Sequence, residues 1–210
     1  MTVMKVSEHH VGIILQKAID ILLSGGIVAY PTETFYALGV KFDMQATLQR
    51  LYDLKQRPRE KAMPLIIGDQ ALLSSLSTSI NRTALSLIEN FWPGPLTLVL
   101  PSSDNLSDSI TAGTHTVAVR VPGKSLALKL AQAARFPITA TSANISGKPP
   151  AVNAGAVIEY FNAKIDLVID GGRTSGESPS TIVDVTGKHA ILLREGAVKK
   201  ENMAAYFMPG

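Results

Sequence analysis

The spacing of apolar residues along the chain predicts a mixture of helices and strands. Repeats of three and four residues are typical of amphipathic helices, whereas short apolar runs and strict alternation are typical of strands. Helical spacing predicts helices over residues 7–24, 43–57, 81–92, 125–136 and 154–161. Apolar runs predict strands over residues 27–30, 64–69, 93–101, 115–122, 138–141, 166–172, 180–187 and 189–196.

The order of these elements predicts the fold class. Helices and strands alternate early in the chain, and strands dominate from residue 166 onward. This order favours the α/β class (α+β type), with a twisted, mixed parallel and antiparallel sheet flanked by helices. No repeat, low-complexity tract or linker interrupts the pattern, so a single domain over residues 1–210 is expected.

Polar residues collect at the ends of several predicted strands. The strand at 27–30 runs into "PTET", the strand at 138–141 runs into "SAN", and the segment at 166–172 ends in "DGG". Ligands of α/β sheets bind at strand ends, where loops present groups from several strands to one cleft. Ordinary turn chemistry uses the same residue types, so each single stretch also fits a simple turn.

Composition narrows the classes of protein and of site. Hydrophobic residues make up 46% of the chain, enough for a sizeable core. No apolar run is long enough for a membrane span and no secretory pattern opens the chain, so we expect a cytoplasmic protein without membrane contact. The absence of cysteine excludes disulfides, thiolate nucleophiles and cysteine zinc sites. The net charge of +3 permits contact with phosphates or RNA without requiring it.

A cluster of cations follows the second predicted helix. Lys55, Arg57, Arg59 and Lys61 fall within "LKQRPREK". Cations at a helix C-terminus complement the helix dipole, which makes a solvated cap one interpretation. The other interpretation is a polyphosphate clamp, because lysine supplies a point charge and arginine a bidentate fork. The residues alone leave both interpretations open.

The common phosphate-binding and catalytic motifs are absent from the sequence. It contains neither the G-x-x-x-x-G-K-[ST] loop nor the G-x-G-x-x-G fingerprint, and no serine lies in a nucleophile elbow. Its four histidines lack metal-ligand spacing, apart from one adjacent pair near the amino end. Any nucleotide site would therefore rely on side-chain cations and hydroxyls, and covalent catalysis is not indicated.

Eight short stretches, taken in order, resemble one family. They are "PTETFYALG", "KQRP…PLI", "WPGPLT", "VAVRVP", "TSANISG", "DGG", "STIVD" and "LREGA". The chain resembles the YrdC-like family, in particular its TsaC-type threonylcarbamoyl-adenylate synthases in their short, single-domain form. The resemblance implies a YrdC-like fold with an open concave groove. It also implies a reaction in which L-threonine, bicarbonate (or CO₂) and ATP, with Mg²⁺, give threonylcarbamoyl-AMP and pyrophosphate. Partner proteins would then carry the threonylcarbamoyl group to tRNA.

The resemblance also assigns catalytic residues. The family's lysine–x–arginine pair falls on Lys55 and Arg57, which would grip the phosphates and the carbamate. Its serine–x–asparagine pair falls on Ser142 and Asn144, expected near ATP and its metal. Adenylation of this kind needs no enzyme nucleophile, because it depends on aligned reactants and neutralised charge. A site of lysine, arginine, serine and asparagine is sufficient for it.

Further positions follow from the same resemblance. Thr32 matches the threonine that contacts the amino-acid substrate, Arg120 the arginine that meets its carboxylate, and Ser180 a position near it. Thr116 falls where a residue near ATP is expected, and Arg194 where a second phosphate contact is expected.

Two features leave these assignments open. Arg120 and Arg194 could instead form structural ion pairs with Asp170 or Asp184. The chain also departs from the family pattern: Ala37 stands where glycine is usual, the segment between Arg57 and "PLI" is longer than the commonest spacing, and Gly68 stands where longer members often have histidine.

Two alternative functions remain. One is an RNA- or tRNA-binding module, although aromatic residues amount to only 6% and the cations form no stripe. The other is a related-branch YrdC-like protein that carries the alanine and acts as a hydrolase or on another amino acid. The sequence is compatible with a monomer or a homodimer.

Overall fold

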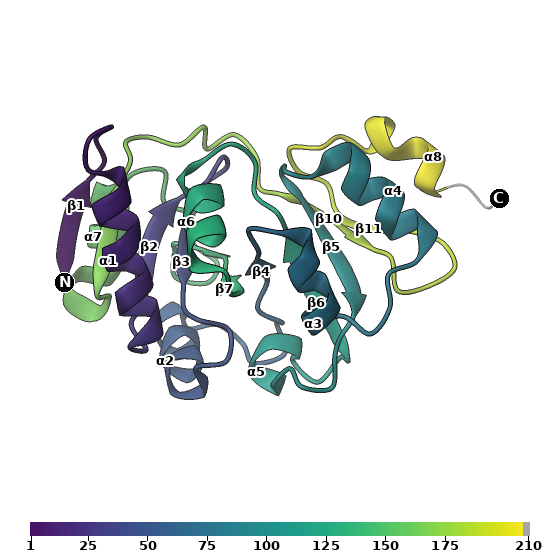
Figure 1. Ribbon diagram of the computed structural model, residues 1–210, viewed down its shortest axis with the longest axis horizontal. Coiled ribbons are helices and arrows are strands. Elements are labelled where there is room, and N and C mark those ends of the chain that lie inside the picture. Colours follow the sequence, from purple (N-terminus) through teal and green to yellow (C-terminus); the bar gives the residue numbers. More distant parts are fainter. Residues whose placement is uncertain (208–210) are drawn as a thin grey trace.

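The computed structural model describes residues 1–207, which form two β-sheets side by side with helices packed around them (Figure 1). The strands are β1 (Thr2–Lys5), β2 (Val28–Pro31), β3 (Tyr36–Gly39), β4 (Leu65–Ile66), β5 (Leu96–Pro101), β6 (Thr116–Arg120), β7 (Ile138–Thr139), β8 (Thr141–Ser142), β9 (Leu167–Asp170), β10 (Thr181–Asp184) and β11 (Ile191–Arg194). The helices are α1 (Val11–Leu23), α2 (Gln45–Lys55), α3 (Leu73–Leu76), α4 (Arg82–Phe91), α5 (Asp108–Thr111), α6 (Leu126–Ala134), α7 (Ala154–Phe161) and α8 (Ala204–Phe207). Three short 3₁₀ helices cover Gln70–Leu72, Asn162–Lys164 and Lys200–Met203.

Both sheets mix parallel and antiparallel pairs, which confirms the predicted fold class. The first has the order β1-β9-β2-β3-β8, parallel from β1 to β2 and antiparallel from β2 to β8. The second has the order β11-β10-β5-β6-β4-β7, in which β10–β5 and β6–β4 are parallel. The division into two sheets differs from the single sheet that the sequence predicted, because the late strands separate: β9 joins the first sheet, and β10 and β11 join the second.

One short segment connects the two sheets. Residues 138–141 were predicted as one strand, but residues 138–142 form β7 at the edge of the second sheet and β8 at the edge of the first. The residue between them, Ala140, donates its backbone N–H to Pro64 O at 2.8 Å. The chain therefore leaves one sheet and enters the other within five residues, and this brings the "TSAN" stretch between them.

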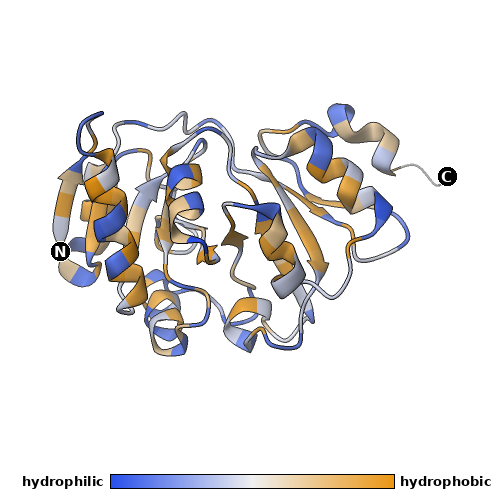
Figure 2. Ribbon diagram, in the orientation of Figure 1, coloured by the Kyte–Doolittle hydropathy of each residue, from blue (hydrophilic) through white to orange (hydrophobic). Residues whose placement is uncertain are grey.

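Apolar side chains fill the space between sheets and helices. Figure 2 shows hydrophobic residues along the strands and on the inner faces of the helices. Helices α1 and α6 cover one face of the first sheet, where Ile14, Ala18 and Leu22 meet Leu130 in a buried cluster. Because α1 has apolar residues at helical spacing, it buries one side and leaves its polar side in water.

Several predicted boundaries were wrong, for local reasons. The first helix begins at Val11 instead of Ser7, whose hydroxyl pairs with His10 Nδ1 at 2.9 Å. Asp43 does not cap α2, because its carboxylate pairs with Lys41. Strands β1 and β3 were not predicted at all. Parallel pairing with β9 holds the exposed β1, a contact that the local pattern does not reveal.

No helix within residues 1–207 combines the length and the apolar character that crossing a membrane requires.

Candidate functional site

A cavity of about 570 Å³ lies between the two sheets. Strands β3 and β8 border it from the first sheet, and β5, β6, β10 and β11 border it from the second. It collects most of the residues that the sequence assigned to the site: Thr32, Arg57, Arg120, Ser142, Ser180 and Arg194. Lys55, Asn144 and Thr116 do not line it.

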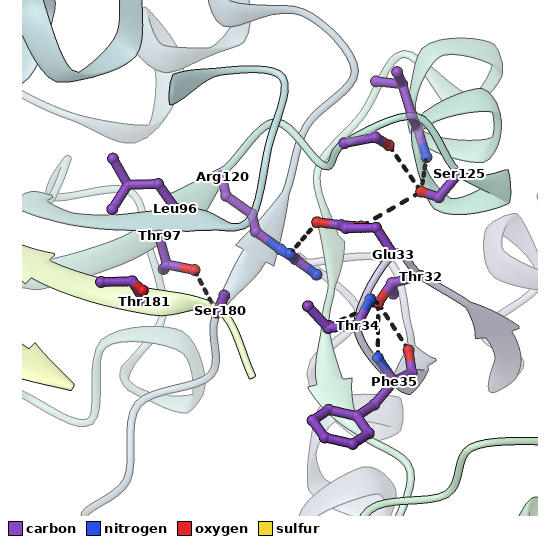
Figure 3. A network of polar contacts seen from close by, with 12 residues as sticks. Thr32, Glu33, Thr34, Phe35, Leu96, Thr97, Arg120, Ser125, Ser180 and Thr181 are labelled. Atoms are coloured by element: carbon purple, nitrogen blue, oxygen red, sulfur yellow. Dashed lines mark hydrogen bonds and ion pairs between the residues drawn. The ribbon is translucent and has the colours of Figure 1, made fainter. Parts of the chain in front are cut away.

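The turn between β2 and β3 places Thr32 at the cavity wall. Its hydroxyl donates to Phe35 O at 2.8 Å and accepts the backbone N–H groups of Thr34 at 3.0 Å and Phe35 at 3.2 Å. Gly176 N donates to Thr34 O at 3.0 Å and ties the turn to a distant loop. The polar residues after β2 therefore close a tight hairpin, and this hairpin forms one edge of the cavity (Figure 3).

Arg120, at the end of β6, forms an ion pair across the gap between the sheets. Its Nη1 lies 2.5 Å from Oε1 of Glu33, and both side chains are largely buried. Figure 3 shows the guanidinium pointing toward the Glu33 carboxylate from the opposite sheet. Asp170 and Asp184, the possible ion-pair partners in the alternative interpretation of Arg120, do not pair with it, because the β2–β3 turn brings the carboxylate of Glu33 to this position.

Lys55 ends helix α2 with a buried side chain, only 1% exposed. Its Nζ donates to the backbone carbonyls of Ser142 and, at 2.8 Å, Asn144. Burial lowers the pKa of Lys55 to about 7, and the charge of Arg57 adds to the effect. The lysine therefore fixes the 142–144 loop from behind and does not reach the cavity surface.

Arg57 does line the cavity. Its guanidinium donates from Nε to Lys61 O at 3.2 Å and from Nη2 to Ala62 O at 2.7 Å, which folds the segment after α2 around it. Burial lowers the pKa of Arg57. Arg59, by contrast, pairs with Asp53 at the surface, 2.7 Å away. The cationic cluster therefore divides, with Lys55 and Arg57 turned inward and Arg59 turned outward.

The Ser142–Asn144 pair forms a small hydrogen-bonded loop. Ser142 Oγ donates to Asn144 Oδ1 at 2.6 Å. Asn144 Nδ2 donates to Ile145 O at 3.0 Å and Lys148 O at 2.6 Å, and the side chain is buried. Ser142 is exposed and lines the cavity. Asn144 therefore shapes the loop, and Ser142 is the member of the pair that lines the cavity.

The far wall of the cavity carries Ser180, Arg194 and a residue that the sequence did not indicate, Thr97. Arg194 donates from Nε at 3.1 Å and from Nη2 at 2.8 Å to Ser180 O. Thr97 Oγ1 lies 3.0 Å from Ser180 Oγ (Figure 3). Burial lowers the pKa of Arg194, with a further contribution from Arg120. In the sequence, Thr97 is a polar residue within the apolar strand "LTLVL", and this feature could have marked it as a candidate site residue.

Thr116 lies at the start of β6, on the same face of the sheet as Arg120, since the two are four residues apart. Its hydroxyl lies 2.8 Å from Thr114 Oγ1. It is therefore on the cavity side of the sheet but beyond the cavity itself.

Among residues 1–207, those that line the cavity include three arginines and no carboxylate. Within residues 1–207, neither Arg57 nor Arg194 forms an ion pair, and Arg120 has only the Glu33 pair. Uncompensated guanidinium groups with neighbouring hydroxyls suit a ligand that carries several negative charges. The described part of the chain has no cluster of histidine, aspartate or glutamate that could hold a metal ion.

Comparison with known proteins identifies the family. Residues 20–196 match the family model Sua5_yciO_yrdC, whose description is "Telomere recombination". The chain belongs to the Sua5/YciO/YrdC family. The predicted resemblance is thereby confirmed.

Individual members of the Sua5/YciO/YrdC family are similar over most of this chain. A protein from Pyrococcus abyssi named "Threonylcarbamoyl-AMP synthase" is 41% identical over 186 residues, which are 89% of this chain and 55% of that protein. The structure of P. abyssi Sua5 complexed with L-threonine matches with a TM-score of 0.93 and 38% identity, over 98% of this chain and 61% of that one. Escherichia coli YciO matches with a TM-score of 0.84 and 26% identity, over 95% and 96%. The chain thus spans little more than half the length of the synthase relative.

Two departures from the family pattern have physical consequences here. Ala37, on β3, is almost fully buried and borders the cavity, where it pairs with Ser142. Gly68 is packed so closely that an added Cβ would lie 2.3 Å from Gln132 N. A histidine at position 68 would therefore require α6 to move, whereas Ala37 leaves the strand pairing intact.

Proposed function

We propose that this member of the Sua5/YciO/YrdC family is an L-threonylcarbamoyladenylate synthase. The observation that carries the proposal is the cavity, in which Thr32, Arg120 and Ser180 lie together with Arg57 and Ser142. An amino-acid carboxylate and a triphosphate are both anions, and this cavity offers arginines on both sheets. The similarity to a Sua5 that was solved with L-threonine supports the same assignment.

The proposed reaction needs no covalent intermediate with the enzyme. The amine of threonine adds to CO₂, or to bicarbonate with loss of water, and gives a carbamate. A carbamate oxygen then attacks the α-phosphorus of ATP, and the bond from that phosphorus to the bridging oxygen breaks, releasing pyrophosphate. Charge builds up on the leaving pyrophosphate, so fixed cations that face it lower the barrier.

We propose a role for each side chain, which its position in or beside the cavity supports. Arg120 and Thr32 receive the amino acid, with Ser180 beside them, and Arg57 and Arg194 receive the phosphates. Ser142 offers its hydroxyl to the nucleotide, and Asn144 and Lys55 hold the loop that presents it. Lys55 therefore acts through the loop. This proposal differs from the sequence-based expectation that Lys55 binds the phosphates directly. The geometry provides no role for Thr116 within the cavity.

We propose that Mg²⁺ enters as part of the nucleotide. No carboxylate of the described part of the chain lines the cavity, so the hydroxyl of Ser142 and the phosphate oxygens would supply the hard oxygen ligands that such an ion prefers. When bound, the ion would neutralise phosphate charge. We further propose that the adenylate product passes to tRNA-modifying partner proteins in the cytoplasm.

The test is pyrophosphate release from ATP, measured with and without threonine and with and without bicarbonate. We expect release only when both co-substrates are present. Release that ignores both of them would refute the proposal. The RNA-binding alternative stays a prediction, and tRNA affinity at two salt concentrations tests it: tight, strongly salt-dependent binding without turnover would favour that alternative.

A further inference from the structure

Glu33 is the one described carboxylate that pairs with a cavity arginine. It lies behind Arg120, outside the lining of the cavity, and its Oε1 is 2.5 Å from Arg120 Nη1. The exposed fractions of the two side chains are 16% for Glu33 and 8% for Arg120, so water screens this pair only weakly. Arg57 and Arg194 have no such partner among residues 1–207.

The position of Glu33 is fixed by its surroundings. Ser175 Oγ donates to Glu33 O at 3.0 Å, and the neighbouring hairpin bonds of Thr32 hold the turn. A Cβ on Gly123 would lie 3.3 Å from Glu33 Cγ, so the side chain fits closely against that backbone. Figure 3 shows the carboxylate between Arg120 and Ser125. The backbone of Glu33 is therefore held in place, and its carboxylate lies between the Arg120 guanidinium and the Ser125 hydroxyl, 3.5 Å from the latter.

The ion pair gives the three arginines two different electrostatic characters. A guanidinium that a buried carboxylate already neutralises keeps directional donors, but it has little net attraction for further negative charge. It can bind a single carboxylate through its remaining N–H groups. A triphosphate carries several charges, and it gains more from guanidinium groups that have no carboxylate partner.

We propose that Glu33 sorts the two anionic substrates: by neutralising Arg120, it reserves that guanidinium for the amino-acid carboxylate and leaves the phosphates to Arg57 and Arg194. The assignment of substrates rests on the proposed function. The sorting of anions rests only on the charges and contacts of the cavity. Glu33 is on this account a positioning and selectivity residue, because it touches Arg120 and does not line the cavity.

The experiment measures pyrophosphate binding alone by titration calorimetry, in the wild type, Glu33→Gln and the double variant Glu33→Gln/Arg120→Gln. Glu33→Gln keeps the shape and an acceptor for Arg120 but removes the charge. We expect it to bind pyrophosphate about tenfold more tightly than the wild type. The gain should disappear in the double variant. Glu8→Gln is the control, because Glu8 is an exposed carboxylate that forms no ion pair within residues 1–207. The pyrophosphate affinity of this variant should equal that of the wild type.

Threonine binding gives the second readout. Pyrophosphate should compete with threonine for binding to Glu33→Gln and not for binding to the wild type. If Glu33 had only a structural role, the variant would bind threonine more weakly, but pyrophosphate would not compete with it. Unchanged pyrophosphate affinity in Glu33→Gln would overturn the proposal.

A second variant tests the sorting even if Glu33→Gln does not fold. Glu33→Gln/Arg120→Gln, which removes both charges of the pair, should leave pyrophosphate affinity within about twofold of the wild type, while Arg194→Gln weakens it about tenfold. Equal losses in the two variants would overturn the sorting. The pyrophosphate measurements need neither turnover nor threonine, so a failure of the proposed function would show separately, as absent threonine binding in the wild type.

Discussion

Lys55 makes the stability of this protein depend on pH. In the unfolded chain a lysine keeps its proton up to a pKa of about 10.4. In the folded protein, burial lowers the pKa of Lys55 to about 7. Between these values the unfolded state binds more protons, so the free energy of unfolding rises with pH. Integrating this difference from pH 7 to pH 9 gives a gain of about 2 kcal/mol. Below pH 7 both states are protonated, and the cost of burying the charge is fully present.

The variant Lys55→Met isolates this effect, because it removes the titrating group and retains a long apolar side chain. Urea denaturation at pH 7, 8 and 9 should show the wild type gaining about 2 kcal/mol relative to the variant across the range. Tyr36 does not disturb this window, because burial raises its pKa to about 12. If the free energy of unfolding changed with pH equally in the two proteins, the reasoning would be refuted. The two carbonyl contacts of Lys55 Nζ would then stabilise the charged lysine as well as water does, and its pKa would not be lowered.

Three further predictions concern single contacts. Asn144→Ala should lower the free energy of unfolding by about 1–3 kcal/mol, because it leaves the carbonyl of Lys148 without its side-chain donor and removes one of the two donors to the carbonyl of Ile145; urea denaturation measures this, and an unchanged midpoint would contradict it. Glu33→Gln/Arg120→Gln removes the guanidinium without leaving Glu33 unpaired, so it should raise the KM for threonine at least about tenfold with little change in the KM for ATP, in steady-state assays of pyrophosphate release. Equal rises in both constants would argue against an amino-acid subsite. Thr97→Val keeps the side-chain shape but removes the hydroxyl near Ser180. The value of kcat/KM for threonine should therefore fall about tenfold, while Tm changes by only a few degrees. Unchanged kinetics would show that Thr97 has no role in the site.

Local patterns determined much of the secondary structure and much of the site. The helices predicted over residues 81–92, 125–136 and 154–161 are present in the structure, where Asn81, Ser125 and Asn153 cap them. The alternation in "TVAVR" correctly separates the residues that face the core from those that share the face of Arg120. These features depend on hydrogen bonds and packing within a few residues, which is why the sequence alone was sufficient to predict them. The ordered motifs likewise predicted six residues that line the cavity.

Only the tertiary structure decided how these pieces meet. The sequence offered Asp170 and Asp184 as partners for Arg120, but the chain brings Glu33 there from 87 residues away. It also predicted one strand over 138–141, whereas the two halves of that segment pair with different sheets. Which carboxylate is nearest, and which sheet edge is open, depend on contacts between residues far apart in the chain. Local spacing carries no information about such contacts, because their geometry is set when the two sheets pack.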